Sequence, residues 1–178
     1  NSRNYSFFQV KDGVLTAHYE VVVDVSRART RFLELALPVT TPATLVIRGI
    51  DDVQIDESIP TVIEDRRVWT VRLSNRRRGV VKLAVDFEIP LTVEAEQTIK
   101  LPLIDVVDAA YQTDVVSVEG DPALEVTTNT KMRSVDVGEV ASASYLPRKR
   151  LLGVFASTPN ARNVDVVVRR RSLMSLPP

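Results

Sequence analysis

Residues 81–89, Val-Lys-Leu-Ala-Val-Asp-Phe-Glu-Ile, carry a large apolar side chain at every second position, with Lys, Ala, Asp and Glu between them. A spacing of two is the period of a β-strand, in which neighbouring side chains point to opposite faces of a sheet. The apolar set therefore predicts one face packed in a core, and the polar set predicts one face turned to solvent. This stretch decides the fold class, because the same spacing recurs along most of the chain.

The segment just before this stretch repeats the pattern. Residues 69–73 alternate in the same way, with Trp69 on the apolar face. The two runs are separated by Ser-Asn-Arg-Arg-Arg-Gly at 74–79, a polar connection that ends in glycine. Such a connection between two alternating runs predicts a β-hairpin with a loop longer than two residues.

A longer alternation runs through residues 15–25, with Tyr19 on its apolar face and His18 on its polar face. Lys-Asp-Gly at 11–13 predicts a tight turn, so that residues 5–10 form a hairpin with this strand. Residues 33–37 continue the pattern until Pro38, which has no N–H to donate to a ladder.

Shorter strands are expected elsewhere, at residues 45–48, 53–55, 61–64, 98–104, 114–119, 124–128, 150–156 and 163–170. One short helix is expected at 136–143, where Asp136 is placed to cap the first turn. Many short strands at regular spacing predict an all-β fold, an antiparallel β-sandwich. We expect residues 1–178 to form a single large domain, with two β lobes at 1–90 and 91–178 as the alternative.

Composition excludes several classes of function. The chain has 23 basic and 23 acidic residues, so no overall field attracts nucleic acid or an anionic membrane. It has no cysteine, which excludes disulfides, thiolate metal sites and cysteine nucleophiles. No apolar run approaches the roughly 20 residues that span a bilayer as a helix. The first residue, Asn1, and the Leu-Pro-Pro end favour a fragment of a longer protein.

Motifs for cofactor or triad chemistry are missing from the sequence. There is no glycine-rich phosphate loop, Gly-x-Ser-x-Gly elbow or His-Glu-x-x-His zinc motif. The only histidine, His18, is expected to be solvated on its strand and to lack convergent partners for a triad or a zinc site. The single tryptophan, Trp69, is expected in the core rather than on a sugar-binding platform. We therefore expect no cofactor.

Carboxylates come in adjacent pairs in one turn-rich stretch. Calcium prefers clusters of loop oxygens, so the weak candidates for a metal site are Asp51, Asp52, Asp56 and Glu57. The stretch lacks the spaced Asp-x-Asp-x-Asp-Gly pattern, so solvated loop charge is the favoured interpretation, and no metal is predicted.

Basic residues form four clusters. Two of them supply the weak candidates for a binding site, namely Arg76, Arg77, Arg78, Arg148, Lys149 and Arg150. Two more clusters lie at Arg27, Arg29 and Arg31 and at 169–171. Clusters that meet on one side of the sandwich would bind an anionic group such as a phosphate, polysaccharide or lipid head group. The alternative is ordinary surface charge, which at strand edges deters aggregation.

The second half of the chain contains segments whose order is informative. Its order of features runs from Ile-Lys-Leu-Pro at 99–102 through Val-Val-Ser-Val-Glu at 115–119 to Ser-Val-Asp-Val-Gly-Glu at 134–139. It closes with Leu-Gly-Val-Phe-Ala at 152–156 and Val-Asp-Val-Val-Val-Arg at 164–169. Across residues 97–171 this order resembles β-rich domains of large, uncharacterised bacterial envelope proteins. The resemblance implies an extracytoplasmic location, in the periplasm or cell envelope, and transfers no site.

These observations favour a non-catalytic structural or protein-interaction module of a larger extracytoplasmic bacterial protein. Its expected partners are other protein domains, such as those of the same longer chain, with no nucleic acid and no membrane insertion by this segment. One alternative is a carbohydrate or anionic-ligand binding module. Another is an enzyme with a carboxylate site on its loops, which would need a cleft holding two or more carboxylates with raised pKa.

Overall fold

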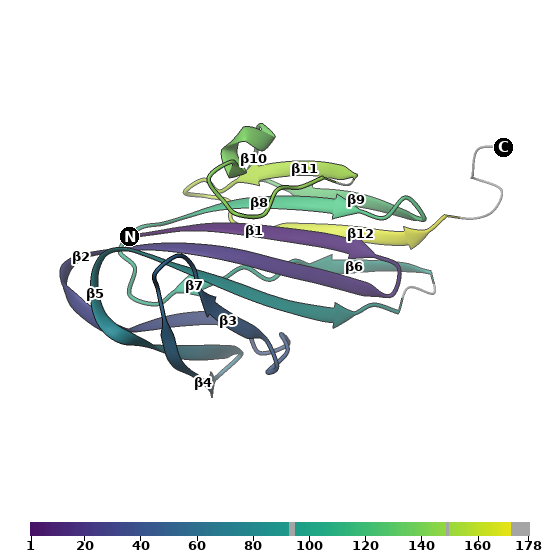
Figure 1. The fold of residues 1–178 in the computed structure, drawn as a ribbon. Helices are drawn as coiled ribbons and strands as arrows, with labels where there is room; N and C mark the ends of the chain where they lie inside the picture. The colour runs from purple at the N-terminus through teal and green to yellow at the C-terminus, as the bar shows by residue number, and fades with distance from the viewer. Residues whose placement is uncertain (93–94, 149, 172–178) are drawn as a thin grey trace.

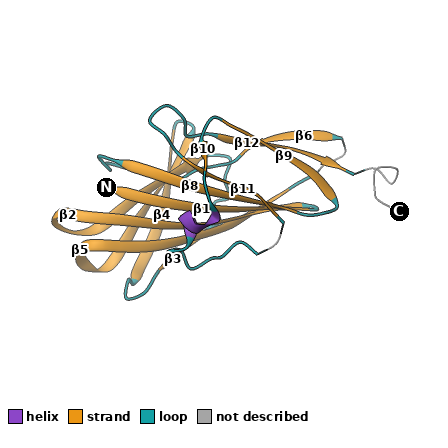
Figure 2. Ribbon diagram, turned by 90° about the horizontal axis from the view of Figure 1, so that it is seen from above, coloured by secondary structure: helices purple, strands orange, loops and turns teal. Residues whose placement is uncertain are grey.

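The computed structural model describes residues 1–92, 95–148 and 150–171, and almost all of its regular structure is β. The elements in chain order are β1 (Ser2–Lys11), β2 (Val14–Pro38), β3 (Val46–Gly49), β4 (Ile55–Ile63), β5 (Arg66–Pro90), β6 (Glu96–Lys100), β7 (Asp105–Val106), β8 (Gln112–Gly120), β9 (Leu124–Thr130), β10 (Arg133–Ser134), the 3₁₀ turn η1 (Val137–Val140), β11 (Leu151–Ala156) and β12 (Val164–Arg170). The predicted all-β fold is confirmed (Figures 1 and 2).

The strands form two sheets. The larger sheet has nine strands in the order β10-β11-β8-β1-β2-β5-β3, with β7 paired to β2 and β4 paired to β5. The smaller sheet has the order β6-β12-β9. Neighbouring strands are antiparallel except β1 and β8, which pair in parallel from Ser2 with Gln112 to Val10 with Gly120. Long connections between these two strands make that parallel pairing possible.

The predicted hairpin between residues 69–73 and 81–89 is wrong. Residues 74–79 lie within a single strand, β5, which is 25 residues long and pairs with the equally long β2. The two strands bend together about halfway along, so that one ribbon contributes to both sides of the core (Figure 1). The two short strands expected at 53–55 and 61–64 are likewise one strand, β4.

Other local predictions are confirmed. β1 and β2 form the expected hairpin, with Asp12 and Gly13 between the paired residues Lys11 and Val14. Gly13 has a φ of 86°, a conformation that glycine adopts without strain. The expected short helix is a single 3₁₀ turn, and the Asp136 side chain accepts a hydrogen bond from the Gly138 amide to cap it.

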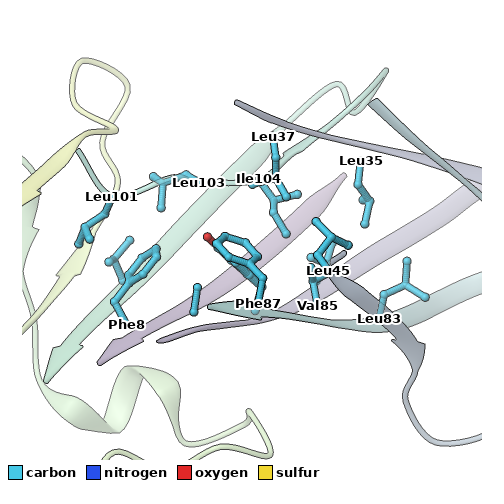
Figure 3. Packing of buried hydrophobic residues seen from close by; sticks show 14 of the residues in the cluster. Phe8, Leu35, Leu37, Leu45, Leu83, Val85, Phe87, Leu101, Leu103 and Ile104 are labelled. Atoms are coloured by element: carbon cyan, nitrogen blue, oxygen red, sulfur yellow. The ribbon is translucent and has the colours of Figure 1, made fainter. Parts of the chain in front are cut away.

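One core joins the two sheets. The three residues whose faces the pattern predicted, Tyr19, Trp69 and Phe87, are all buried there. Leu35 and Leu37 from the far half of β2 pack in the same cluster as side chains from the near half of the ribbon (Figure 3). The cluster includes residues from before and after position 90, among them Leu101, Leu103 and Ile104.

Candidate functional site

The shared bend of β2 and β5 gathers charge at one end of the sandwich. Val25 pairs with Gly79, but the next pair is Thr30 with Arg77, so the register shifts between them. Such irregularities leave extra residues unpaired, and they bend and twist a ribbon. We name residues 26–31 of β2 and 74–79 of β5 the arginine bend, which Figure 1 shows at the end where both strands turn over.

Two clusters that are about fifty residues apart in the sequence meet in the arginine bend. Its six arginines are Arg27, Arg29, Arg31, Arg76, Arg77 and Arg78. The structure thus brings three of the predicted binding residues together with a cluster that the candidate set did not include.

Three of these arginines have partners in the protein. Arg77 donates two hydrogen bonds to the Asp52 carboxylate, at 2.9 and 3.1 Å. Arg31 donates to the Leu73 carbonyl at 3.1 Å, and its guanidinium lies 3.5 Å from the Asp56 carboxylate. Arg78 donates only to a backbone carbonyl, at 3.3 Å. Within the bend, two of the six positive charges are therefore ion-paired.

The other three, Arg27, Arg29 and Arg76, are exposed and have no partner among the residues that the structure describes. Their guanidinium groups keep all their donors free for an external acceptor. A planar guanidinium can bind a carboxylate with two parallel hydrogen bonds. The bend therefore presents three unused carboxylate-binding groups.

The carboxylates considered for a metal site serve mainly as counter-charges. Arg77 lowers the pKa of Asp52 through hydrogen bonds and its charge. The Ser74 hydroxyl lowers the pKa of Asp56, and nearby guanidinium charges add to the effect. Glu57 lies 3.6 Å from the Arg72 guanidinium, and Asp51 lies 3.9 Å from the Lys82 ammonium. In residues 1–92, 95–148 and 150–171, no three His, Cys, Asp or Glu side chains group as a metal site would.

The remaining predicted basic residues lie elsewhere. The Arg150 carbonyl accepts a hydrogen bond from the Gly120 amide, and Gly120 pairs with Val10 near the β1–β2 turn. Arg148 and Arg150 are therefore near the β1–β2 turn, at the opposite end of the sandwich from the arginine bend, and Lys149 lies outside the described residues. The two predicted clusters do not form one patch.

A polar cluster on the outer face of the large sheet was missed. His18 lies on the predicted face, but its side chain is only 18% exposed, so the expectation of a solvated histidine is wrong. Its Nδ1 is 2.6 Å from an Asp86 oxygen, and its Nε2 is 3.2 Å from a Glu20 oxygen. Burial alone would lower the pKa of His18, but the two carboxylates outweigh burial and raise it above 6.5.

The cluster is covered by residues 136–148, which we name the strap. Glu20 accepts hydrogen bonds from the strap amides of Ser144, at 2.8 Å, and Tyr145, at 3.0 Å. Burial would raise the pKa of Glu20, but these bonds and His18 outweigh it, so the pKa is lowered. The Tyr145 hydroxyl donates to Glu119 at 2.7 Å. Burial and this bond raise the pKa of Tyr145 to about 12.

A second, partly buried network links the loop before β12 to the larger sheet. Arg162 donates to Asp114 at 2.5 Å and to the Ile104 carbonyl at 2.6 Å, and it also contacts Asp105. The Asp114 side chain is fully buried, so this pairing compensates a charge that would otherwise be costly. The first missed network connects residues up to 125 positions apart, the second connects residues 48 to 58 positions apart, and no local motif marks either one.

A recess of about 380 Å³ opens beside Glu20, with Arg3, Tyr5 and Lys82 in its lining. Arg3 lies over the Tyr5 ring at 5.3 Å and is 3.7 Å from a Glu139 oxygen. The charged groups of this recess thus contact one another or the strap. Its carboxylate Glu20 has a lowered pKa, whereas a loop-based acid–base site needs two carboxylates with raised pKa.

Comparison with known proteins gives a faint likeness of fold. No protein family model matches the chain, and no characterised protein matches its sequence. Among solved structures, it is similar to native leukotriene A4 hydrolase from Saccharomyces cerevisiae, with 11% identity and a TM-score of 0.46 over 93% of this chain. A second native structure of the yeast enzyme gives 11% identity and a TM-score of 0.47 over 94% of this chain. The chain spans 28% of the length of each of these proteins.

No helix in the part of the chain that the structure describes is both long and apolar enough to cross a membrane.

Proposed function

We propose that this chain is a non-catalytic protein-interaction module of a larger, extracytoplasmic bacterial protein, and that it binds an acidic region of a partner protein at the arginine bend. The observation that carries the proposal is the set Arg27, Arg29 and Arg76, which are exposed on the two strands of the arginine bend and have no partners in the described structure.

The charge around the bend favours a protein over a continuous polyanion. Asp24, Asp51 and Asp52 are exposed near the arginines, and the whole chain carries no net charge. A nucleic acid or an anionic membrane presents a uniform field, which these carboxylates would repel. A protein partner can place a few carboxylates against the arginines and avoid the acidic positions.

A glycan is less well matched to this surface. Sugar-binding platforms are built from exposed aromatic rings, and the Trp69 side chain is buried, with 5% exposure. Catalysis is also poorly supported, because His18, Glu20 and Tyr145 make their contacts with neighbouring side chains and the strap. These contacts give each of the three side chains a structural role.

The test uses fluorescence anisotropy with a labelled peptide of alternating glutamate and serine. We expect the wild-type chain to bind it at an ionic strength of about 10 mM and to lose binding above about 0.5 M, because salt screens exposed charges. The triple variant Arg27→Gln, Arg29→Gln, Arg76→Gln should bind about tenfold more weakly, equivalent to about 1.4 kcal/mol.

A matched control removes the same charge elsewhere. Arg133, Arg148 and Arg150 are also exposed, and they lie beyond β1 and β8 from the ribbon, so their triple glutamine variant changes the net charge equally at positions outside the arginine bend. We expect it to bind within about twofold of wild type. Equal losses in the two triple variants, or no binding by the wild-type chain at the lowest ionic strength, would refute the proposal.

A further inference from the structure

The smaller sheet ends on one side in β6, whose outer edge is open. Among the described strands β6 pairs only with β12, and the ladder from residue 96 to residue 100 contains no bulge. β6 contains no proline, whereas the free edge of β4 carries Pro60 and a register shift. Proline and bulges are the usual means of blocking an edge, so β6 is the more open of these two edges.

The backbone of β6 directs three residues at this open edge. The Leu101 amide donates to the Val164 carbonyl, and residues that bond to one neighbour of an antiparallel strand alternate with residues that face the other side. Odd-numbered residues of β6 therefore bond to β12, and even-numbered residues face away from it. The N–H and C=O groups of Glu96, Thr98 and Lys100 have no hydrogen-bond partner among the residues that the structure describes. The edge thus offers three donors and three acceptors.

The side chains of the same three residues lie on the outward face of the smaller sheet. β12 buries Val164, Val166 and Val168, so its odd-numbered residues point outward, and they share that face with the residues of β6 that they pair with. Glu96 and Lys100 are exposed, and Lys100 has no ion-pair partner in the described part of the chain. The outward face of β6 therefore carries a negative charge at one end and a positive charge at the other.

We propose that β6 pairs with β6 of a second copy of this chain, antiparallel and about a two-fold axis at Thr98, so that two three-stranded sheets become one continuous sheet. Thr98 then pairs with Thr98 of the second copy, and Glu96 pairs with Lys100 at both ends. Each of these three pairs exchanges two backbone hydrogen bonds, because all their N–H and C=O groups face the edge. Registers shifted by two residues place Glu96 or Lys100 opposite Thr98 and lose both Glu96–Lys100 pairs.

The charges of the joined sheet alternate in this register. Within one chain Arg169 pairs with Glu96 on one side and with Glu125 on the other, and it donates to Glu125 at 2.8 Å. Lys100 pairs with Asp165 of β12. One row of the joined sheet therefore contains Glu125, Arg169 and Glu96 of one chain, followed by Lys100 and Asp165 of the second copy. Opposite charges directly across a ladder are stabilising, so this pattern fits a second copy of the same strand.

The other edge of the smaller sheet lacks this complementarity. β9 carries one charged residue, Glu125, and no basic residue from position 124 to position 130. Two β9 strands paired with each other would therefore gain no pair of opposite charges. The charge pattern favours β6 as the edge that binds a second copy.

The test measures dimerisation by sedimentation velocity at low ionic strength. We expect a dissociation constant of about 50 μM for the wild-type chain, because one strand edge forms a small interface of the transient class. Glu96→Lys and Lys100→Glu each place like charges opposite each other at both ends of the edge, so each variant alone should dimerise about tenfold more weakly. An equal mixture of the two variants restores both opposite-charge pairs and should dimerise within about twofold of wild type.

Glu125→Lys is the matched control for charge. Glu125 and Glu96 flank Arg169 on opposite sides, so the same substitution at Glu125 gives the same net charge without altering the β6 edge. We expect Glu125→Lys to dimerise within about twofold of wild type.

Proline variants distinguish the two edges. The Arg171 amide donates to the Ala123 carbonyl, so even-numbered residues of β9 face away from β12, as those of β6 do. Thr98→Pro and Thr128→Pro therefore each remove an N–H that points at a free edge and leave the ladder with β12 in place. Thr98→Pro should abolish the dimer, and Thr128→Pro should leave it unchanged.

Three outcomes would overturn the inference. They are a wild-type chain that stays monomeric at about 500 μM, a mixture of the charge variants that dimerises no better than either alone, and equal losses in the two proline variants. Circular dichroism shows whether each variant is folded. β6 lies in the smaller sheet, away from the arginine bend, so monomeric Thr98→Pro should still bind the acidic peptide there (Figures 1 and 2). Failure of the dimer and failure of the proposed function are therefore distinguishable.

Discussion

Replacement of Glu20 by alanine should loosen the strap and destabilise the protein measurably. The Glu20 side chain is 6% exposed and accepts hydrogen bonds from the strap amides of Ser144 and Tyr145. A hydrogen bond to a charged group contributes about 1.5–3 kcal/mol, and the lower value applies here because the strap reaches solvent. Two such bonds give a loss of about 3 kcal/mol in the free energy of unfolding.

The assay is urea denaturation followed by far-ultraviolet circular dichroism, together with amide hydrogen exchange. With an m-value of about 2 kcal/mol per molar, the midpoint should fall by about 1.5 M urea. Protection should drop first at the amides of residues 144 and 145. Glu88→Ala is the control, because Glu88 is exposed on β5. Equal midpoints for Glu20→Ala and Glu88→Ala would refute the assignment of Glu20 as the anchor of the strap.

Three further predictions concern other parts of the fold. The pKa of His18 is raised in the folded state, so its stabilising contribution is complete below pH 6.5 and is lost as pH rises through the folded-state pKa. Denaturation midpoints measured from pH 6 to 9 should show this decline in wild type and not in His18→Gln. Arg162→Met leaves the Asp114 charge buried without its partner, and calorimetry should show a loss of about 3–5 kcal/mol. Gly49→Ala places a Cβ 1.9 Å from the Val53 carbonyl oxygen, which forces the chain after β3 to shift. Its melting temperature should fall by several degrees, whereas Gly138→Ala, whose nearest contact is 3.0 Å away, should change it less.

Alternation was sufficient to predict the strands and their buried faces. Tyr19, Trp69 and Phe87 are in the core as expected, since a period of two relates the sequence directly to the faces of a sheet. The turn at Asp12 and Gly13 could be predicted as well, because its conformation depends on local residues. These features need no knowledge of which strands are neighbours.

Pairing over long distances could not be predicted in the same way. Residues 74–79 are polar and end in glycine, which is equally typical of a loop and of an exposed bend within one strand. The bend extends past the core, so its side chains need not be apolar even though the strand continues. What decides between the two is the pairing of β5 with β2, which local periodicity does not contain.

The same limit explains what was missed at the sites. His18 is on the predicted face, but the strap that covers it comes from more than 100 residues later in the chain. The predicted arginines 76–78 needed the ribbon pairing to bring them to Arg27 and Arg29, because the two clusters are distant in sequence. The arginine clusters could be recognised in the sequence, but the sequence does not show that they come together in the fold.

The continuous ribbon also has a mechanical consequence. In a sandwich whose sheets are joined only by loops, the two sheets can slide or separate while each keeps its hydrogen bonds. Here β2 and β5 contribute buried residues to the core on both sides of the arginine bend. The two parts of the core therefore cannot separate unless the bend opens. The arginine bend therefore links two parts of the core through continuous strands. A partner bound to the bend would restrict the movement of both parts.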